Sequence, residues 1–104
     1  MKTNELFETV KTNGRVAKVL GIYSINNLPK VRLFDGQVID LQIFAKYIKN
    51  KPEDEAVVFG REGYGADFEI GTTNFYSRIH FAVVRVGAMW QVLDCSLNGM
   101  SIVE

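Results

Sequence analysis

The chain from residue 56 to residue 104 reads AVVFGREGYGADFEIGTTNFYSRIHFAVVRVGAMWQVLDCSLNGMSIVE. Short runs rich in valine, isoleucine and aromatic residues alternate here with segments rich in glycine, asparagine and aspartate. β-branched and aromatic residues favour strands, whereas glycine, asparagine and aspartate favour the turns between them. This half of the chain therefore predicts several short strands of an all-β sandwich or barrel.

The N-terminal half predicts further strands and leaves two points open. Residues 15–25 favour a strand, and residues 30–34 and 37–44 alternate as the two arms of a hairpin. Residues 44–48 also fit a helical turn, and the pattern does not separate the two. Asn13-Gly14 is typical both of a helix end and of a hairpin turn. We favour a helix over the first twelve residues, because Glu5-Leu6-Phe7-Glu8 does not alternate.

The chain is predicted to form one domain over residues 1–104. The charged, proline-containing segment at residues 50–55 is expected to be a surface loop, and it separates an N-terminal segment (residues 1–55) from a core (residues 56–104) within that domain. The fold class that we expect is all-β, with one short helix if the N-terminal helix forms.

Composition excludes several classes of protein. Twelve basic and twelve acidic residues give no net charge, which argues against a nucleic-acid-binding protein. A single cysteine forms no internal disulfide, and one Cys with one His is too few for a zinc site. The sequence has neither a signal peptide at its start nor an apolar run long enough to span a bilayer. We therefore expect a soluble cytoplasmic protein that binds neither nucleic acid nor membrane.

The polar residues between the C-terminal strands suggest an anion site. Arg61 follows a strand, Ser77 and Arg78 end a loop, and Asn98 lies in another turn. A guanidinium, a hydroxyl and a carboxamide together suit one phosphate group and a length of peptide backbone beside it. His80 has no neighbouring acid and nucleophile to make it a catalytic base, so we expect a structural histidine and no enzymatic activity.

The order of these motifs resembles the forkhead-associated (FHA) domain, a β-sandwich that reads phosphothreonine. The chain has Gly-Arg at residues 60–61, Ser-x-x-His at residues 77–80 and Asp-x-Ser-x-Asn-Gly at residues 94–99. The spacing between the motifs also fits the family. The resemblance implies a protein–protein interaction module in signalling, which binds a phosphorylated protein or peptide and needs no cofactor or metal.

The resemblance also implies a role for each motif residue. Arg61, Ser77 and Arg78 are expected to bind the phosphate. Asn98 is expected to bind the peptide backbone. Gly60, His80 and Gly99 are expected to support the loops. Tyr64 and residues 74–76 are expected to read the side chains that flank the phosphate.

The chain departs from the family pattern at two places. Leu97 stands where the family often has serine or threonine, and only residues 100–104 follow Asn98-Gly99, where the family has further strands. We expect the N-terminal segment to supply those strands, with the hairpin at residues 30–44 among the candidates. The alternatives are a homodimer that completes the sheet and a reduced relative with part of the fold. The second functional hypothesis is an FHA-like scaffold that mediates protein assembly without phosphate recognition.

Overall fold

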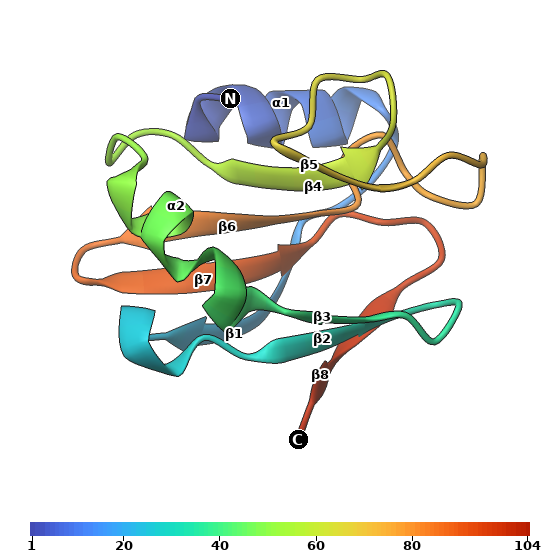
Figure 1. Cartoon of the computed structure of the whole chain (residues 1–104). Coiled ribbons are helices and arrows are strands. Elements are labelled where there is room, and N and C mark those ends of the chain that lie inside the picture. The colour runs from blue at the N-terminus through green and yellow to red at the C-terminus, as the bar shows by residue number, and fades with distance from the viewer.

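The chain folds into two β-sheets and two α-helices, and the computed structural model describes all 104 residues (Figure 1). The larger sheet has the strand order β1 (Lys18–Tyr23), β7 (Met89–Asp94), β6 (Phe81–Val86), β4 (Val57–Arg61), β5 (Phe68–Gly71). The smaller sheet has the order β3 (Val38–Asp40), β2 (Lys30–Leu33), β8 (Met100–Val103). The helices are α1 (Thr3–Thr12) and α2 (Ala45–Asn50), with 3-10 helices at Ile25–Asn27 and Leu41–Phe44. The predicted β-rich fold is confirmed.

The two sheets share one hydrophobic core. The smaller sheet contributes Val31, Leu33 and Ile39, and the larger sheet contributes six residues: Val57, Phe59, Phe81, Val83, Trp90 and Val92. Phe59 and Phe81 stack within it, with their ring centroids 4.4 Å apart and their planes 6° from parallel. Burial of an aromatic side chain on this scale contributes about 1.5–3 kcal/mol relative to exposure.

Helix α1 forms a second core with the opposite face of the larger sheet. Leu6 and Val10, one helical turn apart, are buried against Val58, Val84 and Leu93. The central strands of this sheet are therefore covered on both faces. This explains why residues 57–59 and 81–84 are continuous apolar runs, since alternation is expected only where one face meets water.

The N-terminal helix is confirmed, and the alternative hairpin at Asn13-Gly14 is wrong. Gly14 has φ +72°, a left-handed conformation that ends the helix at little cost for glycine. Its N–H donates to the carbonyl of Lys11 (2.9 Å), and the N–H of Arg15 donates to the carbonyl of Val10 (2.9 Å). The local sequence allows a helix end and a hairpin turn equally at Asn13-Gly14. Burial of Leu6 and Val10 on one helical face favours the helix.

The fold class is not all-β with at most one helix, because α2 is a second α-helix. The arm predicted at residues 37–44 ends early: β3 stops at Asp40, whose carboxylate accepts a hydrogen bond from the N–H of Gln42 (3.0 Å). This side-chain acceptor favours a turn over continued pairing. Leu41 then enters the core, and Ile43 remains 78% exposed. No helix in the chain has the length and apolar character that crossing a membrane requires.

The N-terminal segment supplies strands to both sheets; that they stand in for strands of the FHA family stays a prediction. β2 pairs antiparallel with β8, the strand that follows Asn98-Gly99, and its other neighbour is β3, the second arm of the predicted hairpin. β1 pairs antiparallel with β7 in the larger sheet. Strands from the first 40 residues therefore lie beside β7 and β8, the strands before and after the loop with Asn98. The homodimer stays a prediction.

Candidate functional site

Four loops meet at one edge of the larger sheet, and strand register is the reason. Phe81, the first residue of β6, pairs with Asp94, the last residue of β7. Lys18 at the start of β1 pairs with the same Asp94, and Phe59 near the end of β4 pairs with Phe81. The loops at this edge are α1–β1 (residues 13–17), β4–β5 (62–67), β5–β6 (72–80) and β7–β8 (95–99).

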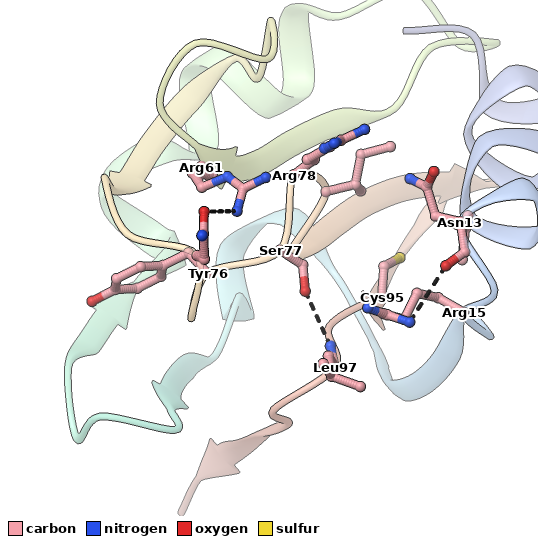
Figure 2. A pocket seen from close by; sticks show the side chains of 11 residues that line it. Asn13, Arg15, Arg61, Tyr76, Ser77, Arg78, Cys95 and Leu97 are labelled. Carbon is pink, nitrogen blue, oxygen red and sulfur yellow. Dashed lines mark hydrogen bonds between the residues drawn. The ribbon is translucent and has the colours of Figure 1, made fainter.

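A cavity of about 330 Å³ lies between these loops (Figure 2). Its lining comes from three of the loops and the ends of α1 and β4: Val10, Asn13, Arg15, Arg61, Asn74, Tyr76, Ser77, Arg78, Ile79, Cys95 and Leu97. The lining holds three arginines and no aspartate or glutamate. In Figure 2 Asn13 and Arg15 lie on the side of α1, and Arg61 lies on the opposite side of Ser77. Such a lining favours an anion.

Arg61 is half-buried at the end of β4. Its N–H donates to the carbonyl of Ser77 (3.1 Å), and its Nη1 donates to Oδ1 of Asn74 (3.0 Å). The guanidinium carbon also lies 4.7 Å from the ring centroid of Tyr64, and that of Arg78 lies 4.7 Å from the same centroid. One tyrosine ring therefore stabilises two cations through its π-electrons and holds both near the cavity.

Ser77 is fixed from three directions. Its Oγ accepts a hydrogen bond from the N–H of Leu97 (3.1 Å), its N–H donates to Nδ1 of His80 (3.1 Å), and its carbonyl accepts from Arg61. A hydroxyl has one proton besides its acceptor lone pairs. The bond from Leu97 uses an acceptor position only, so the hydroxyl proton of Ser77 remains available to a ligand oxygen.

His80 connects two of the loops from a fully buried position. Its N–H donates to the carbonyl of Phe59 (2.9 Å), and its carbonyl accepts from the N–H of Cys95 (3.0 Å). Burial lowers the pKa of His80, and the nearby carboxylates of Asp94 and Asp35 only partly oppose that effect. The ring is therefore neutral at pH 7, with Nδ1 as acceptor and the proton on Nε2, which has no partner in the protein.

We expect the unfolding free energy to decrease as the pH falls below 6.5, the ordinary pKa of histidine. Burial lowers the folded-state pKa of His80, so below pH 6.5 the unfolded chain takes up a proton that the folded chain does not. The stability is fully present above pH 6.5 and is lost as the pH falls towards the folded-state pKa. The chain has a single histidine, so an NMR titration reports it directly. A folded-state midpoint at or above 6.5 contradicts the prediction.

Two glycines shape the loops around the cavity. A Cβ on Gly60 would lie 1.9 Å from the backbone carbonyl oxygen of Arg78, so only glycine allows β4 to approach this loop. Gly99 has φ +83°, and its N–H donates to Oγ of Ser96 (2.9 Å). Ser96 Oγ in turn donates to Oδ1 of Asp94 (2.6 Å), which fixes the β7–β8 loop to the end of its strand.

Asn98 does not line the cavity. Its Nδ2 donates to the carbonyl of Phe75 (2.8 Å), which connects the β7–β8 loop to the β5–β6 loop at the rim. Leu97 lines the cavity instead and is 66% exposed. The structure thus places Arg61, Ser77 and Arg78 together around one cavity, and it places Asn98 beside them.

Sequence reasoning missed Asn13 and Arg15. The sequence favours Asn13-Gly14 as the end of a helix and Arg15 as the start of a strand, and nothing local connects either residue with Arg61. Two contacts between distant parts of the chain bring them to the cavity: the packing of α1 on the larger sheet and the pairing of β1 with β7.

Cys95 lines the cavity without being a reactive group. Burial raises its pKa to about 12, so the thiol stays protonated at neutral pH. A thiol reacts as a nucleophile only in its deprotonated form. Cys95 therefore adds no negative charge to the cavity, and the charged groups of its lining are the guanidinium groups of the three arginines.

No family model, curated protein or solved structure matches the chain. Membership of the forkhead-associated family stays a prediction from the motif residues, and the chemistry of the cavity carries the functional argument.

Proposed function

We propose that the chain is a phosphothreonine-peptide-binding module with an FHA-like β-sandwich fold. The observation that carries the proposal is that Arg61, Ser77 and Arg78, from two separate motifs, line one cavity that holds no carboxylate. The module mediates protein–protein interaction in signalling and is not an enzyme.

The donors of the cavity match a phosphate group. A phosphothreonine carries about −1.5 to −2 charges and three acceptor oxygens. Arg61 has guanidinium N–H groups beyond the one that Asn74 accepts, Ser77 has its hydroxyl proton, and Arg78 has a second guanidinium. Each charge-assisted hydrogen bond contributes about 1.5–3 kcal/mol, so two of them increase the affinity roughly 100-fold or more.

One hydrogen bond supports a role for Asn98 in binding the peptide backbone. Its Nδ2 donates to the carbonyl of Phe75, which fixes the side-chain amide and leaves its oxygen without a partner in the protein. An amide oxygen accepts hydrogen bonds from peptide N–H groups. We therefore assign Asn98 to the residue next to the phosphothreonine, with its oxygen as the acceptor.

The strand arrangement supports the FHA-like fold. Two sheets share a core, and the loops that carry the three motifs leave the larger sheet at one edge. The segment before the motifs provides β1, β2 and β3 as neighbours of β7 and β8. These pairings support the proposal that N-terminal strands take the place of those that the family has after Asn-Gly.

Peptide titration tests the proposal. A degenerate peptide library with a central phosphothreonine is titrated by fluorescence anisotropy, and the matched library has unmodified threonine at the same position. We expect measurable binding of the phosphorylated library alone. Free phosphate should compete with it, because the anion occupies the same donors. Equal binding of the two libraries, or no binding of either, contradicts the proposal.

A second candidate function has specific support. Leu97 places an apolar side chain in the cavity lining where the family often has a hydroxyl. This observation favours an FHA-like scaffold that assembles proteins without reading phosphate. The two functions differ in their need for Arg61, because only phosphate recognition requires that cation.

A further inference from the structure

The cavity extends beyond the predicted phosphate-binding residues to the α1–β1 loop. Val10, Asn13 and Arg15 belong to the same lining as Arg61 and Ser77. Figure 2 shows Arg15 beside Cys95, on the α1 side of Ser77, and Arg61 on the other side. The phosphate site and Arg15 thus open into one continuous space.

Arg15 keeps most of its hydrogen-bonding capacity free. Its Nη1 donates to the carbonyl of Asn13 (3.3 Å), which is one of the five N–H groups of a guanidinium. The three ion pairs of the structure all involve lysine, so no carboxylate neutralises Arg15. The carbonyl of Val10 at the helix end is already bonded to the N–H of Arg15. Arg15 is thus held in place by the loop without being neutralised.

The size and charge of the cavity exceed what one phosphate group needs. A cavity that holds one water has about 10–15 Å³, so 330 Å³ accommodates much more than a phosphate with its five non-hydrogen atoms. Arg15, Arg61 and Arg78 together carry three positive charges, whereas a phosphothreonine carries about two negative charges at most. One positive charge, on the α1 side, is left for a second anionic group.

We propose that the ligand is a phosphothreonine peptide with a second anionic side chain, which Arg15 binds on the α1 side of the cavity. This inference rests on the proposed function and names its ligand class more closely. The second group is a carboxylate or another phosphate, which share the oxygen acceptors that a guanidinium binds. Arg15 belongs to the N-terminal segment, so that segment selects the ligand in addition to completing the sheets.

The experiment uses peptides with one phosphothreonine, in which each flanking position in turn is glutamine, glutamate or phosphoserine. In the wild-type chain we expect glutamate or phosphoserine at one or two adjacent positions to increase affinity about tenfold over glutamine. In Arg15→Gln we expect the ratio of the affinities for the anionic peptide and the glutamine peptide to fall from about ten to about one. Lys11→Gln is the matched control, because it removes one positive charge from an exposed residue of the last helical turn outside the cavity.

The outcomes separate this inference from the proposed function. Binding of the glutamine peptide with no gain from any anionic position overturns the role of Arg15 and leaves the phosphothreonine site intact. A gain that persists in Arg15→Gln, or that disappears equally in Lys11→Gln, also overturns it. A wild-type chain that binds none of the phosphorylated peptides contradicts the proposed function, and this inference with it. Glutamate and phosphoserine in separate arms show which anion Arg15 prefers.

Discussion

Replacement of Arg61 by alanine is expected to lower the affinity for a phosphothreonine peptide about 100-fold. The side chain lines the cavity with its guanidinium oriented by Asn74 and by the ring of Tyr64. Loss of two charge-assisted hydrogen bonds at about 1.5 kcal/mol each corresponds to this factor. The measurement is anisotropy titration with the phosphorylated peptide and its unmodified counterpart, which shows whether the lost affinity is specific to phosphate.

Two further variants make the Arg61 result specific. Arg61→Lys keeps the charge but loses the planar, bidentate donor pair, so we expect it to recover only part of the affinity. Arg32→Ala removes the same charge from an exposed position on β2, outside the cavity, and should bind as the wild-type chain does. Unchanged partner binding in Arg61→Ala contradicts phosphate recognition and favours the scaffold function. An equal loss in Arg32→Ala would show that only long-range charge matters.

The parts of the fold that the sequence predicts are those set by local patterning. β2 and β3 follow from alternation at residues 30–33 and from the Asp35-Gly36 turn, and their pairing is as expected. The end of β3 did not follow from the same pattern, because Ile39, Leu41 and Ile43 continue the alternation beyond it. The carboxylate of Asp40 and the entry of Leu41 into the core decide that end, and both depend on tertiary packing.

In the candidate site, too, local motifs predict some residues and tertiary contacts place the others. Arg61, Ser77 and Arg78 were predicted together because each lies in a short motif of known order, and they line one cavity. Arg15 was not predicted, since its place depends on the register of Lys18 with Asp94 across the β1–β7 pair. A contact between residues so far apart in sequence has no local signal.

Replacement of Gly60 by alanine is expected to destabilise the chain by about 3 kcal/mol, at the upper end of what overpacking costs. An alanine Cβ would lie 1.9 Å from the carbonyl oxygen of Arg78, and a backbone oxygen cannot rotate away as a side chain can. Either β4 or the loop with Ser77 and Arg78 must move. Alanine loses less backbone entropy on folding than glycine, by about 0.5–1 kcal/mol. Backbone entropy alone therefore predicts that Gly60→Ala stabilises the chain.

Gly21→Ala is the control for the Gly60 prediction, because it introduces the same methyl group into the same sheet. Its Cβ would meet the ring and hydroxyl of Tyr23 at 2.3–2.7 Å, and that side chain is able to turn aside. Urea denaturation should therefore show a much smaller loss for Gly21→Ala. Gly60→Ala should also shift the amide NMR signals of Ser77 and Arg78 and weaken phosphopeptide binding where the chain remains folded. Equal stability losses in the two variants would contradict this prediction. They would mean that the loop with Arg78 moves as readily as the side chain of Tyr23, and that Gly60 is not required for β4 to lie close to that loop.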